Sequence, residues 1–163
     1  MSEKLNMDEK ITIFNIAPWN VAFPNLTTHG GTSIQPNART RIRREEVIEQ
    51  VSAGNKLLAG LDEYGSHATI IIEDEETRKY LEFDSEDGKR TQNVITKEKI
   101  IKWFDLKTES AFEKNIRENV KTRAEKQYLL KCIKDLKLND YEKIKFCQEY
   151  CKFSLRGIYE RWG

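Results

Sequence analysis

The chain has 163 residues, enough for one domain or for a small domain with an appendage, so two large catalytic domains are excluded. Apolar residues make up 38% and charged residues 34% of the chain, a polar balance that still allows a folded core and argues against wholesale disorder. The formal net charge is only +1, but residues 1–90 carry 11 Lys and Arg against 16 Asp and Glu, whereas residues 91–163 carry 17 against 11, so an acidic first half precedes a basic second half.

Short β-strands are predicted after a polar leader, residues 1–10. Ile11 and Ile13, and later Val21 and Phe23, alternate with other residues at period two, and prolines interrupt the pattern. Paired glycines after the second of these segments supply the positive φ angles that a tight turn requires. These features predict a hairpin or an open loop in the first forty residues.

An edge strand is predicted where arginines recur at every second position. Arg39, Arg41 and Arg43 flank Thr40 and Ile42, and a turn signal precedes them. Alternate side chains share one face of a strand, so the three arginines would form a charged row facing solvent.

A short amphipathic helix is predicted directly after this strand. Val47, Ile48 and Val51 lie at helical spacing, and glutamates occupy the first turn. Gly54 and Asn55 would end the helix, because glycine readily adopts the left-handed conformation that follows a helical C-terminus.

A buried central strand is predicted from the most β-branched run of the chain, residues 68–72. Residues 78–83 then predict a partner strand, joined to it through an acidic turn at residues 73–76. A charged link, residues 85–95, follows and marks the expected domain boundary.

Helix signals dominate the second half. Thr96 and Thr108 are predicted N-caps, the first of a short helix and the second of a longer one. Apolar residues recur at every fourth position from Phe112 to Tyr128, which predicts a single helix of about 28 residues. Asn139 or Asp140 would cap a last helix that extends to about Lys152.

The sequence therefore predicts an α+β fold. Its first part would be a small antiparallel β-rich module, barrel-like or sandwich-like with one short helix, and its second part a helical module. The expected boundaries are 1–10 for the leader, 11–84 for the β-rich module, 85–95 for the link, 96–152 for the helical module and 153–163 for an apolar C-terminal segment.

No membrane contact is expected. The longest uncharged stretch, residues 11–28, contains asparagines and prolines and is too irregular to span a bilayer. The charged start does not resemble a signal peptide, and the clustered, odd set Cys132, Cys147 and Cys151 favours reduced thiols inside a cell.

Catalytic chemistry has little support in the sequence, and neither a cofactor nor a metal is predicted. Asp62, Ser66 and His67 share one loop, but neighbouring residues point in different directions, so a loop pinned by hydrogen bonds is favoured over a catalytic triad. Cys147 and Cys151 share a helix face, yet no fourth metal ligand is evident, and core packing is favoured. Phosphate-binding motifs are absent. We expect a protein that is not an enzyme.

Partner binding is the favoured chemistry. The cluster Arg39, Arg41, Arg43 and Arg44 could contact an acidic protein or, as the alternative, a nucleic acid. Lysines and glutamates alternate in the helical half, which would neutralise much of its positive charge.

Two tryptophans are candidate apolar anchors for a partner, because Trp and Arg dominate binding hot spots. Trp103 lies on the apolar face of its own predicted helix and fits a core position better. Trp162 lies one residue from the C-terminus, where both interpretations fit.

Residues 44–60 and 65–70 resemble small accessory proteins from the structural gene cassettes of tailed bacteriophages. The resemblance covers residues 11–83 best and residues 94–151 more faintly. It implies a virion protein, capsid-associated or connecting head to tail, that is made in the host cytoplasm and binds other virion proteins in multiple copies. It implies no catalytic residue. The expected alternative is a nucleic-acid-binding or regulatory phage protein.

Overall fold

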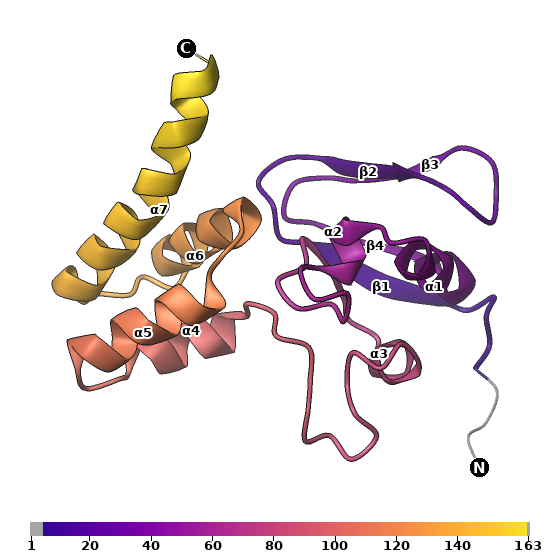
Figure 1. Cartoon of the computed structure of the whole chain (residues 1–163), viewed down its shortest axis with the longest axis horizontal. Coiled ribbons are helices and arrows are strands. Elements are labelled where there is room, and N and C mark those ends of the chain that lie inside the picture. The colour runs from indigo at the N-terminus through magenta and orange to yellow at the C-terminus, as the bar shows by residue number, and fades with distance from the viewer. Residues whose placement is uncertain (1–4, 163) are drawn as a thin grey trace. The chain divides into compact units, whose positions relative to one another are not determined.

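The computed structural model describes residues 5–162, and it describes side chains as far as Cys151. The chain divides into two compact units, Met1–Val94 and Ile95–Gly163 (Figure 1). The division falls within an uncharged stretch, so the first unit carries the net charge of −5 and the second the net charge of +6. Each unit is described separately.

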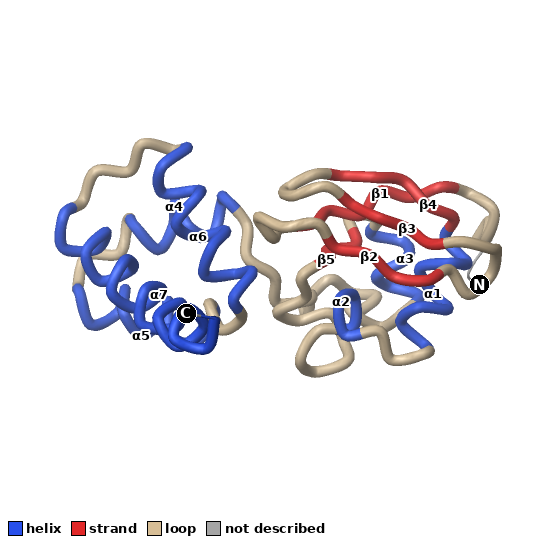
Figure 2. Tube along the Cα trace, turned by 90° about the horizontal axis from the view of Figure 1, so that it is seen from above, coloured by secondary structure: helices blue, strands red, loops and turns tan. Residues whose placement is uncertain are grey.

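The first unit is built on a three-stranded antiparallel sheet. β1 (Lys10–Asn15) is its central strand, β4 (Arg39–Arg43) pairs with one edge of β1, and β5 (Ile70–Ile72) pairs with the other. β2 (Val21–Pro24) and β3 (Gly31–Ile34) form a separate hairpin (Figure 2). The predicted α+β class and the predicted edge position of residues 39–43 are confirmed.

Two details of the predicted sheet are wrong. The β-branched run at residues 70–72 is buried, but it forms an edge strand, because only β1 has partners on both sides. The sheet does not close into a barrel, since β4 and β5 do not pair with each other. The strand order depends on pairing between distant segments, which local patterns do not reveal.

Residues 5–94 contain three helices, where one was predicted. α1 (Arg44–Ser52) is the expected helix, and α2 (Lys56–Ala59) and α3 (Glu75–Tyr80) follow it. The predicted strand at residues 78–83 is wrong. Asp74 caps α3 by accepting a hydrogen bond from the Thr77 backbone N–H at 3.0 Å, so the acidic run is the first turn of a helix, where negative charge is favoured.

The core of the first unit lies between the sheet and its helices. On β1 and on β5, every second side chain points to the side of the sheet where the helices lie. These side chains are buried together with apolar side chains from the helices and loops. The most deeply buried of these side chains belong to Ile13, Ile16, Ile34, Val47, Leu58, Ile70, Ile72 and Phe83.

The charged link at residues 85–95 is held mainly to the first unit. Asp84 pairs with Arg78 at 2.8 Å and accepts a hydrogen bond from the Gln92 backbone N–H at 3.1 Å. Arg78 also donates to the Ile72 carbonyl at 3.0 Å. These contacts connect β5, α3 and the end of the link.

The helical unit contains four helices among its described residues. They are α4 (Lys97–Phe104), α5 (Glu109–Asn119), α6 (Arg123–Asp135) and α7 (Tyr141–Trp162). Thr96 and Thr108 cap α4 and α5 as predicted, and Asp140 accepts a hydrogen bond at the start of α7. Lys143 donates to the Phe104 and Leu106 carbonyls at the C-terminal end of α4, where a cation is favourable.

The predicted single helix from Thr108 is wrong, because it is broken into α5 and α6. Val120 has an extended backbone, and Thr122 forms a capping box with Glu125 in which each side chain accepts a hydrogen bond from the other residue's backbone N–H. A capping box satisfies backbone donors that a continuous helix would not expose. At the break between α5 and α6, the Tyr150 hydroxyl donates a hydrogen bond to the Val120 carbonyl at 2.7 Å.

α7 is longer than predicted, since it continues beyond Lys152 to Trp162. The side chain of Trp162, one of the two candidate anchors, lies outside the described residues. Among the described residues, no helix combines the length and the apolar character that crossing a membrane would require.

Glu46 on α1 fastens the loop after β2. Its carboxylate accepts hydrogen bonds from the backbone N–H groups of Leu26 and Thr27, from the Thr27 hydroxyl and from Gln50. Burial alone would raise the pKa of Glu46, but these hydrogen bonds outweigh it and lower the pKa from 4.5 to about 2. The ionised form is therefore the one that the fold selects.

We expect the first unit to lose stability in acid through Glu46. A lowered pKa contributes stability that is present above pH 4.5 and is lost as the pH falls towards 2. Between these limits the wild-type unfolding free energy should fall by about 3 kcal/mol more than that of Glu46→Gln. Urea titrations followed by the amide NMR signal of Val47, buried in this unit, would measure it.

The exposed Glu49→Gln on the same helix is the control for the loss of one negative charge, and its unfolding free energy at neutral pH should stay within about 0.5 kcal/mol of the wild type. Identical profiles for Glu46→Gln and the wild type would contradict the assignment.

Candidate functional site

The outer face of the three-stranded sheet carries a row of positive charge. Arg39, Arg41 and Arg43 are exposed and alternate along β4, as predicted. Cross-strand pairing places Phe14 opposite Arg39 and the exposed Lys10 opposite Arg43, on the same face. We call Lys10, Arg39, Arg41 and Arg43 the basic sheet face.

Arg39 is held in place at one end of this row. It forms a two-point ion pair with Glu73, with Nε at 2.6 Å from Oε1 and Nη2 at 3.2 Å from Oε2. Its guanidinium also lies 4.1 Å from the centroid of the Phe14 ring, close enough for a cation–π contact. Phe14 is thereby buried although it points to the outer face. The Arg39 side chain is therefore held in one orientation at this end of the basic sheet face.

Arg41 and Arg43 are held more loosely. Arg41 donates to the Lys10 carbonyl at 3.2 Å and makes no ion pair among the described residues. Arg43 lies 3.4 Å from a Glu45 oxygen and 4.0 Å from an Asp8 oxygen, and its side chain is 49% exposed. Exposed ion pairs of this kind contribute little to stability, so a partner can replace them at small cost.

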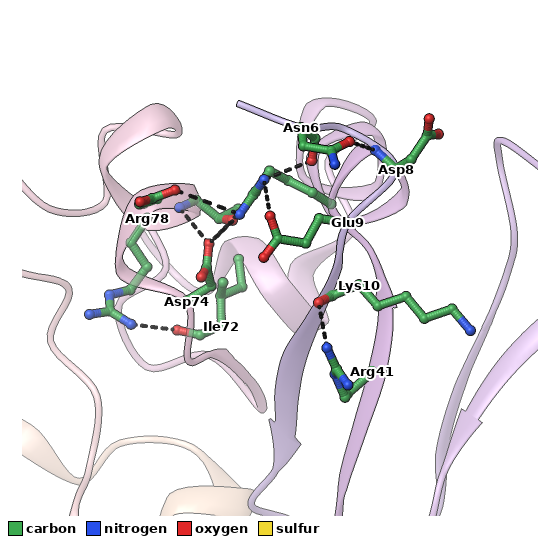
Figure 3. Close-up of polar contacts among 11 residues, drawn as sticks. Asn6, Asp8, Glu9, Lys10, Arg41, Ile72, Asp74 and Arg78 are labelled. Atoms are coloured by element: carbon green, nitrogen blue, oxygen red, sulfur yellow. Dashed lines mark hydrogen bonds and ion pairs between the residues drawn. The ribbon is translucent and has the colours of Figure 1, made fainter. Parts of the chain in front are cut away.

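Arg44 does not belong to the exposed cluster, and its predicted place there is wrong. Its side chain is 1% exposed. The guanidinium donates to the Asn6 carbonyl at 2.7 Å, to Thr77 Oγ1 at 3.0 Å and to Asp74 Oδ2 at 3.2 Å. Figure 3 shows two of these partners, Asn6 and Asp74, apart from the contact between Arg41 and Lys10. The sequence holds a signal for this, since Arg44 comes directly after Arg43, and neighbouring side chains of an extended chain point to opposite sides.

Arg44 is compensated by carboxylates on both sides. Glu9 Oε2 lies 3.4 Å and Glu76 Oε2 3.8 Å from it, in addition to Asp74. Burial would raise the pKa of Asp74, but hydrogen bonds from Thr77 and Arg44 and the Arg44 charge lower it. Removal of one partner from a buried, hydrogen-bonded ion pair leaves the other uncompensated and destabilises the fold.

Trp103, the other candidate anchor, is in the core of the helical unit. Its side chain is 6% exposed, and it is buried together with other apolar residues of the four helices. It therefore offers no anchor on the surface of this unit. Ile100, Phe112, Ile116 and Leu129 are fully buried in the same unit.

The loop of Asp62, Ser66 and His67 is folded by its own polar groups. Asp62 accepts hydrogen bonds from the backbone N–H groups of Tyr64 at 2.8 Å and Ser66 at 3.1 Å. Burial would raise the pKa of Asp62, but these bonds and one from the Ser66 side chain lower it. Ser66 Oγ accepts from the Asn93 backbone N–H at 3.1 Å, and the His67 backbone N–H donates to the Asn93 carbonyl at 2.8 Å.

Gly65 completes this loop. It has a positive φ of 83°, and a Cβ there would collide with the Phe83 ring and the Gln92 side chain. The loop therefore packs tightly against the core, with its polar groups used in folding.

All three cysteines are buried and unpaired by disulfides. Burial raises the pKa of Cys147 and of Cys151 to about 12 and also raises that of Cys132. Among the side chains that the structure describes, no group of three or more His, Cys, Asp and Glu is arranged to hold a metal ion. The three thiols act as small apolar side chains of the helical core.

Comparison with protein-family models, with curated proteins and with solved structures found no match to this chain. The resemblance to tailed-phage structural proteins therefore stays a hypothesis.

We expect Arg44→Met to destabilise the first unit by about 3 kcal/mol, because it leaves Asp74 and the Asn6 carbonyl without their buried donor. Urea unfolding followed at the Val47 amide would measure the change. Arg43→Met, one residue away and exposed, should stay within about 0.5 kcal/mol of the wild type. Equal effects of the two substitutions would contradict the structural role of Arg44.

We expect the cysteines to resist thiol reagents in the native protein. A thiol that is buried and has a raised pKa is almost entirely protonated at pH 8, and the thiolate is the reactive form. Without urea, Ellman's reagent at pH 8 should label the cysteines only as fast as the protein unfolds. In urea it should label all three thiols. Rapid labelling of any cysteine without urea would indicate a reactive thiol instead.

Proposed function

We propose that this chain is a non-enzymatic assembly protein of a tailed-phage particle that docks onto an acidic protein surface through its basic sheet face. The observation that carries the proposal is the arrangement of Lys10, Arg39, Arg41 and Arg43 on one exposed face of a rigid sheet. Arginine suits this role, because its planar guanidinium binds carboxylates at two points and Arg is enriched at interfaces.

In the basic sheet face, Arg39 at one end is held in place, and Arg41 at the centre is available to a partner. Glu73 and Phe14 hold the guanidinium of Arg39, and this fixes one end of the arginine row. Arg41 has no ion pair among the described residues, so its charge is open to a partner's carboxylate. Fixed geometry reduces the entropy lost on binding.

A protein partner is favoured over a nucleic acid by the charges around the face. Asp8, Glu45 and Glu73 lie among its arginines, and the whole first unit has a net charge of −5. A phosphate backbone would meet repulsion from these carboxylates, whereas a protein surface can place its own charges to avoid them. In the helical unit, several basic side chains are paired with acidic ones, as in Arg117–Glu113 and Lys131–Asp135.

The setting in a virion is supported by the resemblance of residues 44–60 and 65–70 to phage structural proteins. The non-enzymatic character is supported by the use of Asp62 and Ser66 in loop hydrogen bonds and by the burial of the cysteines. Partners would be other virion proteins present in many copies, such as capsid or connector subunits.

We expect the double variant Arg41→Glu, Arg43→Glu to be lost from phage particles, because it places negative charge against an acidic partner. Mass spectrometry of purified particles of the encoding phage would give the copy number for each variant. A decrease of at least about tenfold is expected, equivalent to about 1.4 kcal/mol of binding.

The control is Lys56→Glu, Lys89→Glu, which makes the same change in net charge at two exposed lysines outside the face. It should keep the wild-type copy number. Absence of the wild-type protein from particles would overturn the virion assignment, and full retention of the arginine variant would overturn the role of the face.

The nucleic-acid alternative is tested with a random-sequence DNA duplex. We expect no binding at low salt. Binding that falls steeply with salt and is removed by Arg41→Glu, Arg43→Glu would favour the alternative over a protein partner.

A further inference from the structure

β4 is an edge strand of the three-stranded sheet. β4 pairs with β1 on one side only, and no other strand of the described residues adjoins it. An open edge of this kind presents N–H and C=O groups on which another extended chain can pair. Native proteins commonly protect such an edge, so its composition is informative.

The ladder between β1 and β4 identifies which groups are open. The Arg44 N–H donates to the Glu9 carbonyl and the Asn15 N–H donates to the Ala38 carbonyl. Bonded pairs alternate in an antiparallel ladder, so Thr40 and Ile42 direct their backbone groups towards β1. Arg39, Arg41 and Arg43 therefore direct their N–H and C=O groups outward.

Arg41 and Arg43 carry both open backbone groups and positive side chains. A strand that added to this edge would place its own side chains directly opposite the arginines, on the same face of the sheet. Carboxylates at alternate positions would match this row. The best position lies opposite Arg41, since Arg39 and Arg43 already have acidic neighbours.

A second copy of this chain does not suit the edge. Antiparallel pairing of two β4 strands centred on Arg41 would set arginine against arginine at every exposed pair. Like charges directly opposite are destabilising. The positive charges on β4 therefore oppose pairing between the β4 strands of two copies and favour a strand of opposite charge.

We propose that β4 accepts an extended acidic segment of a partner protein as an additional antiparallel strand. The segment would alternate carboxylates, opposite the arginines, with β-branched residues beside Thr40 and Ile42. This inference depends on the proposed function, because it specifies how the basic sheet face docks its partner. Backbone hydrogen bonds would supply affinity and the arginines selectivity.

A peptide of seven alternating Val and Glu residues, blocked at both ends, is the probe. In an antiparallel pair opposite Arg41, the glutamates direct their N–H groups towards β4 and the valines direct theirs away. We expect the peptide to bind the full chain and to slow amide hydrogen exchange at Arg41 and Arg43 by at least about tenfold.

Two N-methylated forms of the peptide separate strand addition from simple charge attraction. They have the same composition and charge, and they carry methyl groups on the three glutamates or on three valines. Methylation of the glutamates should abolish binding, while methylation of the valines should leave it within about threefold. Equal binding of both forms, or no binding of the parent peptide, would overturn strand addition.

Failure here and failure of the proposed function are distinguishable. If Arg41→Glu, Arg43→Glu is lost from particles but both methylated peptides bind equally, the face docks by side chains alone and strand addition is overturned. The same double variant should also lose the parent peptide, and should bind the matching peptide of alternating Val and Lys. Unchanged preference for the acidic peptide would overturn the role of the arginines in selection.

Discussion

The structure of the first unit depends on the burial of one guanidinium. Arg44 follows the exposed row of β4, and its side chain turns to the opposite side, where it contacts Asn6 in the leader and Asp74 and Thr77 at the start of α3. Its backbone N–H also extends the β1–β4 ladder by donating to Glu9. Because Arg44 is fixed on the inner side, the alternation of the strand obliges Arg43, Arg41 and Arg39 to face outward. A buried cation thus orients an exposed set of cations.

The two kinds of arginine show how environment decides the role of one residue type. Arg44 has its donors satisfied by the backbone, a hydroxyl and carboxylates, and it stabilises the fold. Arg41, with one backbone acceptor and an open flank, contributes little to the fold and is suited to contacts with a partner. Arg39 is intermediate, since Glu73 and Phe14 hold it without burying it. Exposure and pairing, more than net charge, therefore point to the interface.

Local signals in the sequence predicted the helix caps at Thr96 and Thr108 and the arginine row, because each depends on neighbours within a few residues. Strand order was missed, since β5 takes its place through pairing with a strand more than fifty residues earlier. Tyr80, Leu81 and Phe83 suggested a strand, but the Asp74 cap determines a helix there. The apolar spacing across Val120 concealed the capping box of Thr122 and Glu125. In the site, Lys10 and Phe14 were missed because only the β1–β4 register places them beside the arginines.

The short segment before β1 has a structural role that its polar composition does not suggest. The Met7 and Glu9 carbonyls accept the first two N–H groups of α1, and the Asn6 carbonyl accepts a bond from Arg44. Residues 6–9 therefore satisfy the first N–H groups of α1 and one donor of Arg44, as a separate capping element would. Any affinity tag or fusion placed ahead of this segment needs a flexible spacer, because tension on Asn6 would uncover a charged group in the interior.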